Sequence, residues 1–201
     1  MSLPSHYLIT PAVDNETEFL AILETSLHAG IKLMQLRSKG MTLDAYEALA
    51  KKVITLAHAN DCKVLLTSNA NMVEKLGADG LHLDSHALKN CENRPLPAPY
   101  LIAASGHDQT ALNKAQAIGA SFALLSQVQY TPAHPDLEPL GWERFGQLAQ
   151  QTHLPVFALG GVKPENEADA IAAGGQGVAG TKGYWKTEQN HSKTETLQPC
   201  S

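Results

Sequence analysis

Two glycine-rich stretches near the C-terminal end of the sequence are the clearest indication of ligand chemistry. The first, residues 156–166, places Gly160 and Gly161 after an apolar run and Pro164 at a first helical position. The second, residues 177–183, holds a further apolar strand and a second glycine turn. Such turns leave main-chain N–H groups bare, so two helix N-termini could converge on one phosphate. The spacing is equally compatible with glycines that only shape two strand-to-helix turns.

Cationic and hydroxyl side chains follow other apolar runs. Arg37 and Lys39 lie one residue apart, and the pair suits a polyanion because arginine offers a planar fork and lysine a point charge. A salt bridge to a neighbouring loop is the alternative. Thr131 and His134 lie in a polar loop, residues 127–140, which exceeds the usual length of about two to six residues for a strand-to-helix connection. This length favours a binding loop.

Other acid–base and metal-binding candidates are few. His82 and His107 could transfer protons, although His82 alternates with leucines in a strand and is expected to be a hydrogen-bonded barrel histidine. A magnesium site usually takes one or two carboxylates together with phosphate oxygens. The predicted strand ends offer Asp84 alone. The residues themselves therefore predict no two-carboxylate metal site.

Apolar runs alternate with helical patterns along the whole chain. Glycines end the helices at Gly30, Gly77, Gly119 and Gly174, where a left-handed residue is needed. An intervening helix implies parallel neighbouring strands, and eight such units predict a single-domain α/β fold, a (β/α)8 TIM barrel over residues 1–185. An open doubly wound sheet is the alternative, but the dinucleotide-binding fingerprint after the first strand is missing. The predicted strands are 6–10, 33–37, 63–67, 80–84, 100–105 and 122–126, with two more in the glycine-rich stretches. The first predicted helix is capped by Asp14 or Asn15 and ends at about His28. The other predicted helices span about residues 43–59, 70–76, 108–118 and 141–151, and residues 90–99 are a predicted loop.

In a barrel, the residues at the strand C-termini surround one mouth. They are Gln35, Arg37, Lys39, Thr67, Asp84, Ser105, Ser126, Gly160, Gly161 and Gly180. The polar residues 186–201 show no periodicity and are expected to form a C-terminal tail.

The composition of the chain argues against several classes of protein. The chain has 201 residues, is 43% hydrophobic and carries a formal charge of -5 without a basic cluster, which argues for one domain and against nucleic acid as a partner. No apolar run reaches the roughly 18 residues of a membrane span, and no signal peptide is recognisable. The three cysteines form no paired motif, which suits a reducing compartment, so we expect a cytoplasmic protein. The sequence leaves the oligomeric state open, including a homo-oligomer.

Five motifs taken together resemble the thiamine phosphate synthase family in order and spacing. They are residues 35–39, 77–83, 131–135, 159–166 and 174–179, within a match of roughly residues 7 to 185. The resemblance implies a (β/α)8 barrel that joins a pyrimidine diphosphate to a thiazole phosphate while magnesium assists the departure of pyrophosphate. It assigns the pyrimidine diphosphate to Gln35, Arg37, Lys39, Ser105 and Thr131. The candidate catalytic residues are Arg37, Lys39 and His134, cations that could together stabilise the departing pyrophosphate. It assigns the thiazole phosphate to Gly161, Thr181 and Lys182, and Gly160 and Gly180 of the glycine turns complete the candidate phosphate-binding residues.

The departures from this family concern the metal. Thr67-Ser68 stands where the family has Asn-Asp, and Ala87 stands where it has a second metal-binding aspartate. The family's Thr-Pro-Thr-Lys loop ends here in His134, which replaces a permanent cation with a titratable one. Lys182 stands where the family has a small hydroxyl residue. Magnesium is thus expected from the family although its usual carboxylate ligands are replaced, with Asp84 or Asp108 as the remaining candidates.

The pattern also resembles two relatives of the synthases. One is the thiazole tautomerase branch, which binds thiazole phosphate without needing the metal. The other, similar in residues 126–131, 139–145 and 182–185, is the synthase-like barrel often fused to a Nudix hydrolase domain. We therefore expect a protein of thiamine metabolism that binds a phosphorylated small molecule and has weak synthase activity at best. A tautomerase and a non-catalytic phosphate-ligand-binding module are the alternatives.

Overall fold

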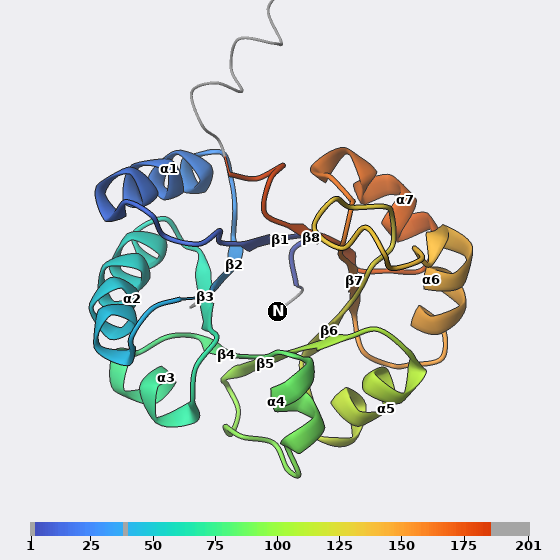
Figure 1. Cartoon of the computed structure of the whole chain (residues 1–201). Helices are drawn as coiled ribbons and strands as arrows, with labels where there is room; N and C mark the ends of the chain where they lie inside the picture. Colours follow the sequence, from blue (N-terminus) through green and yellow to red (C-terminus); the bar gives the residue numbers. More distant parts are fainter. Residues whose placement is uncertain (1–2, 38–39, 186–201) are drawn as a thin grey trace, which may run out of the picture.

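A computed structural model describes residues 3–37 and 40–185 of the chain. Within them, eight parallel strands form a closed barrel inside a ring of helices (Figure 1). The elements in chain order are β1 (His6–Ile9), α1 (Glu16–His28), β2 (Leu33–Leu36), α2 (Leu43–His58), β3 (Lys63–Leu66), α3 (Ala70–Leu76), β4 (Gly80–Leu83), α4 (Ser85–Asn90), β5 (Leu101–Gly106), α5 (Gln109–Ala117), β6 (Phe122–Leu125), α6 (Gly141–Ala149), β7 (Val156–Ala158), a 3-10 turn (Pro164–Asn166), α7 (Glu167–Ala172) and β8 (Gly177–Gly180).

The barrel closes where its last strand meets its first. β8 pairs in parallel with β1, with Leu8 opposite Gly180, and every other strand pairs with its neighbour in sequence. This closure confirms the predicted (β/α)8 barrel and shows that the alternative of an open doubly wound sheet is wrong. The C-terminal ends of all strands therefore lie at one end of the molecule.

Alternation along the strands divides the core into two apolar layers. One cluster fills the barrel and includes Tyr7, Leu65, Phe122 and Phe157. The larger cluster lies between the strands and the surrounding helices, and it includes Leu36 from the outward side of β2. Because successive strand residues face opposite ways, Gln35 and Lys63 lie on the same side of their strands as the barrel interior.

Local chemistry explains where the helices begin and end. Asn15, Thr42, Asn69, Asp84 and Asp108 each accept a main-chain N–H bond at a helix start, as capping residues do. The predicted left-handed glycines are confirmed, with φ of 101° at Gly30, 69° at Gly77, 71° at Gly119 and 91° at Gly174.

The structure corrects two expectations about helices. Residues 85–90 form α4, which the sequence pattern did not predict because this six-residue segment lies against a proline-rich loop. The expected pair of helix N-termini is also wrong: among the described residues, β8 leads into a turn in which Thr181 O accepts bonds from Tyr184 N and Trp185 N. This turn crosses the space between α7 and α1, where the ring of helices has a gap (Figure 1).

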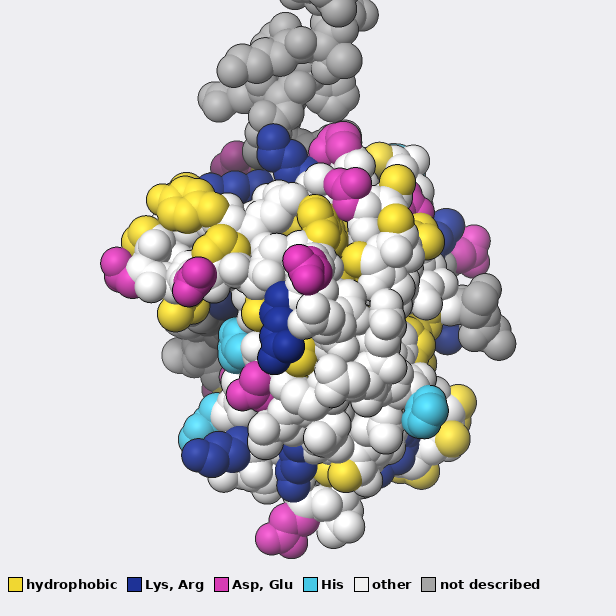
Figure 2. Space-filling model, turned by 90° about the vertical axis from the view of Figure 1, so that its right-hand side faces the viewer, with side chains coloured by type: hydrophobic (Ala, Val, Ile, Leu, Met, Phe, Trp, Pro, Cys, Tyr) yellow, Lys and Arg dark blue, Asp and Glu magenta, His cyan; other side chains and the backbone are white. Residues whose placement is uncertain are grey.

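The surface carries scattered charge. On the face seen in Figure 2, lysine and arginine side chains are interspersed with aspartate and glutamate and form no continuous basic patch. In the part of the chain that is described, no helix is long and apolar enough to cross a membrane. Lys39 and the predicted tail, residues 186–201, lie outside the described residues.

Candidate functional site

Gln35 lies on the floor of the mouth at the C-terminal end of the barrel. It is 5% exposed, and its amide Nε2 donates to Thr67 Oγ1 at 2.7 Å. Its Oε1 is buried without a hydrogen-bond partner in the described structure. A buried acceptor without a partner is costly, so this oxygen is available to a donor on a ligand. Arg37, two residues further, is exposed at the rim, and its main-chain N–H donates to Thr10 Oγ1.

A buried hydrogen-bond chain crosses the barrel beneath the mouth. His82 contacts Tyr7 Oη through Nδ1 at 3.1 Å and Ser105 Oγ through Nε2 at 2.8 Å. Burial lowers the pKa of His82 to about 3, so its imidazole is neutral at neutral pH, with one nitrogen donating and the other accepting. His82 is thus the hydrogen-bonded barrel histidine that its alternation predicted. Ser105, a predicted substrate-binding residue, is tied to it.

A second hydrogen-bond chain lies at the exposed rim. His107 Nδ1 donates to the Ser126 main-chain oxygen at 2.8 Å, and Ser85 Oγ lies 3.1 Å from His107 Nε2. In the neutral imidazole this arrangement leaves Nε2 as the acceptor of the Ser85 hydroxyl proton. Sequence reasoning identified His107 and Ser126 but missed Ser85, because the helix that presents it was not predicted.

The loop of residues 127–140 lies beside β7 and β8 (Figure 1). Val128 N and Gln129 N donate to Leu159 O and Gly160 O, so the loop begins as an extension of the strand pairing. The Gln127 amide is 6% exposed and donates to Leu137 O at 2.7 Å. Sequence reasoning missed this buried glutamine as the tie across the loop.

The predicted loop residues Thr131 and His134 stand at the outer part of this loop. Thr131 Oγ1 accepts a bond from Ala133 N, and the His134 side chain is exposed. The imidazole makes no hydrogen bond within the described residues. Main-chain hydrogen bonds hold His134 within the loop, but no hydrogen bond to a described residue fixes its imidazole over the mouth.

The two glycine turns lie against each other at the ends of β7 and β8. A Cβ atom on Gly183 would be 2.3 Å from Pro164 Cδ, and one on Gly180 would be 3.8 Å from Val162 O. In the first turn, Gly160 and Gly161 have φ of 89° and 71°. The parallel pairing of their strands thus brings the two turns together.

The paired turns present main-chain donors. In the described structure, the N–H groups of Gly161, Val162, Thr181, Lys182 and Gly183 have no hydrogen-bond partner. Such groups form anion-binding concavities. The exposed Lys182 side chain adds a cation that makes no ion pair with a described residue. The arrangement can bind a phosphate through N–H groups and one ammonium.

The side chains present do not fit a two-carboxylate magnesium site. Ser68 Oγ donates to Met72 Sδ, and Ala87 packs against the core. Asp84 and Asp108, the remaining candidates, each use a carboxylate oxygen at 2.8 Å to cap a helix. The described residues contain no group of three or more histidine, cysteine, aspartate or glutamate side chains that could hold a metal ion.

The structure is a (β/α)8 barrel whose last two strands end in contacting glycine turns with unpaired main-chain N–H groups in the described residues. Residues 6–183 match the model of the thiamine monophosphate synthase family, and the chain belongs to this family. "Putative thiamine-phosphate synthase" of Geobacter sulfurreducens is 33% identical over 178 residues, which cover 87% of this chain and 84% of that one. The thiamine-phosphate synthase of Thioalkalivibrio sulfidiphilus is 28% identical over 95% of this chain and 92% of its own length.

A solved structure shows the same fold. The thiamine phosphate pyrophosphorylase from Pyrococcus furiosus superposes with a TM-score of 0.75, covering 95% of this chain and 92% of that chain at 21% identity. The family and the barrel expected from the sequence are therefore confirmed. The closer relationship to the Nudix-fused barrels and to the tautomerase branch stays a prediction.

Proposed function

We propose that this thiamine phosphate synthase-like protein binds a phosphorylated thiazole-type ligand at the mouth of its barrel. One observation supports the proposal above the others: the two glycine turns touch and their N–H groups are free to bind a phosphate. Lys182 extends from the second turn and adds a positive charge. The sequence resemblance assigns the thiazole phosphate to these same turns.

We further propose that synthase turnover is weak or absent. In the family reaction pyrophosphate departs from the pyrimidine, and the thiazole nitrogen captures the resulting carbocation. Stabilising that departing charge is an electrostatic task, and without the family's carboxylates it would rest on Arg37, Lys39 and His134. His134 is exposed in a loop, so it is a poorer fixed charge than the family's lysine.

A tautomerase is the second candidate, and the rim histidine favours it. Hydrogen bonding to Ser126 O leaves His107 Nε2 able to accept a proton, which is what isomerisation of a thiazole requires. Conversion between thiazole phosphate isomers, followed by proton NMR, would test it. Absence of conversion by the wild type would eliminate this candidate, and equal conversion by the wild type, His107→Ala and His134→Ala would exclude both histidines as the proton shuttle.

The first experiment combines turnover with binding. Pyrophosphate release and thiamine phosphate formation are measured with pyrimidine diphosphate, thiazole phosphate and magnesium, beside calorimetric titration with thiazole phosphate and with its dephosphorylated alcohol. We expect magnesium-independent binding of the phosphate, much weaker binding of the alcohol and little product. Equal binding of both ligands would contradict the proposal that the glycine turns bind the phosphate. Product far above background would contradict the proposal that synthase turnover is weak because the family's metal ligands are replaced.

Arg37→Ala tests the assignment of the pyrophosphate side. We expect the substitution to abolish any residual pyrophosphate release, because it removes a fixed cation from the rim, while thiazole phosphate affinity stays unchanged. Lys89→Ala, at an exposed position in α4, serves as the control for loss of one positive charge. Unchanged turnover in Arg37→Ala would contradict the mapping.

A further inference from the structure

A cleft lies at the opposite end of the barrel from the mouth. It has a volume of about 350 Å³ and is lined by Leu3, Pro4, Lys32, Leu33, Asp61, Lys63 and Leu101. Leu33, Lys63 and Leu101 are the first residues of β2, β3 and β5, so the cleft is the amino-terminal opening of the barrel. Leu3 and Leu101 pack against the apolar cluster that fills the barrel interior, and they give the cleft an apolar wall.

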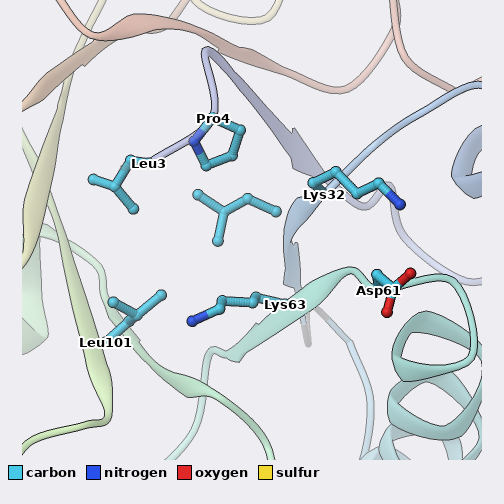
Figure 3. Close-up of a pocket in the computed structure, with 7 residues that line it drawn as sticks. Leu3, Pro4, Lys32, Asp61, Lys63 and Leu101 are labelled. Atoms are coloured by element: carbon cyan, nitrogen blue, oxygen red, sulfur yellow. The ribbon is translucent and has the colours of Figure 1, made fainter. Parts of the chain in front are cut away.

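Lys63 places a cation in this opening. Its stem lies on the inward side of β3, the side of Leu65 in the interior cluster. Figure 3 shows its amine directed toward Leu101 and away from Asp61. The residue is half-buried, and its ammonium makes no ion pair or hydrogen bond with any other described residue.

The other lysine of the cleft is turned away from its centre. Lys32 Nζ donates to Asn60 O at 2.8 Å, and its amine points away from the centre of the cleft (Figure 3). Lys51, Lys52 and Lys75 elsewhere on the surface are all paired with glutamates. Lys63 therefore differs from them in combining an unpaired charge with apolar surroundings.

We propose that this cleft binds a small carboxylate with an apolar chain, held by Lys63. A charge beside apolar surface is stabilised by an opposite charge and a hydrogen bond. One inward-facing ammonium matches a monoanion, whereas the second cation that would suit a phosphate dianion, Lys32, points away from the centre of the cleft (Figure 3). The volume lies at the lower end of the range of roughly 300–1,000 Å³ for small-molecule sites. This inference is independent of the function proposed for the mouth.

Titration of the full chain with octanoate tests the proposal, by calorimetry and by NMR shifts that locate the ligand. We expect saturable binding with shifts at Leu33, Lys63 and Leu101, and roughly tenfold weaker binding of octanol, which lacks the charge. Lys63→Met keeps the apolar stem and should weaken octanoate binding by about tenfold or more. Lys32→Met removes the neighbouring charge as the matched control and should change the affinity by less than about twofold.

Leu101→Phe provides a second variant that fills the cleft and leaves the charge in place. It should also reduce octanoate binding, and thermal unfolding checks that each variant is folded. Absence of saturable binding to the wild type overturns the proposal. So does equal affinity of the wild type and a folded Lys63→Met protein, or shifts confined to the mouth.

Discussion

At the scale of single residues, the polar groups of the mouth fall into two kinds. Asp84 and Ser105 are committed to helix capping and to His82. His134 and Lys182 are exposed, and their side chains make no hydrogen bond within the described residues. Ligand-dependent chemistry is therefore expected of the second kind, whereas substitution of the first kind should chiefly affect stability.

His82 should make stability depend on pH. Its folded pKa of about 3 lies below the ordinary histidine value of 6.5, so the unfolded chain binds a proton that the folded chain does not. His82 therefore does not lower the free energy of unfolding above about pH 6.5. Between about pH 6.5 and pH 3 it lowers this free energy by up to about 1.4 kcal/mol for each pH unit of acidification. Urea unfolding at pH 7 and pH 5, beside NMR titration of the imidazole, would measure this. A His82 resonance that titrates near 6.5 contradicts the prediction.

Lys182 should contribute to phosphate affinity. We expect Lys182→Ala to weaken thiazole phosphate binding by about tenfold, because a charge-assisted bond of about 1.5 kcal/mol is lost. Binding of the dephosphorylated alcohol should not change. Calorimetric titration of the variant and of Lys89→Ala would separate this local contact from the effect of net charge. An equal loss for the alcohol would count against the assignment.

At the scale of elements, the β6–α6 loop and the turn after β7 form one unit. Gly161 is its tightest point, since a Cβ there would be 2.4 Å from Tyr130 O. Gly77 has nearly the same φ, but a Cβ at that position would meet nothing within 4 Å. The two glycines therefore separate backbone strain from steric contact between loop and turn.

Gly161→Ala should be the more damaging substitution of this pair. We expect Gly77→Ala to cost about 1 kcal/mol of unfolding free energy from its left-handed backbone alone. Gly161→Ala should cost at least about 1 kcal/mol more, because the loop must also move, and it should weaken phosphate binding. Urea unfolding and ligand titration measure both effects. Equal losses of stability would show that the loop contact is not constraining.

At the scale of the whole molecule, the barrel completes its ring without a described helix after β8. Residues 181–185 take that place: Tyr184 is 5% exposed, its Oη donates to Val178 O at 3.2 Å, and Ser26 Oγ donates to Tyr184 O at 2.9 Å. The Trp185 ring lies 4.9 Å from that of Phe19. This short segment thus joins β8 to α1.

Tyr184 should therefore matter for global stability. Tyr184→Ala removes a buried ring, and we expect a loss of about 3 to 5 kcal/mol of unfolding free energy. Tyr184→Phe keeps the ring and removes only its hydroxyl hydrogen bonds, so it should cost about 1 kcal/mol. Denaturant unfolding of both variants provides the comparison. A similar small loss in both would mean that the segment does not close the barrel.

Much of this architecture follows from the sequence alone. Apolar runs, left-handed glycines and capping residues are local signals, and they located the eight strands, most of the helices and the strand-end residues. They failed at α4, where six residues are too few for a periodic pattern, and after β8, where a second glycine turn suggested a helix. The family was recognisable because its motifs keep their order and spacing along the chain.

Tertiary structure decided which polar groups are available. Ser85 meets His107 only because β4 and β5 are neighbours, and Gln35 meets Thr67 only because β2 pairs with β3. The apolar surroundings of Lys63 and the contact between the two glycine turns likewise depend on the pairing of separate strands. Local residue types fix the elements through backbone geometry, whereas hydrogen-bond partners and burial are set by distant segments that only the closed barrel brings together.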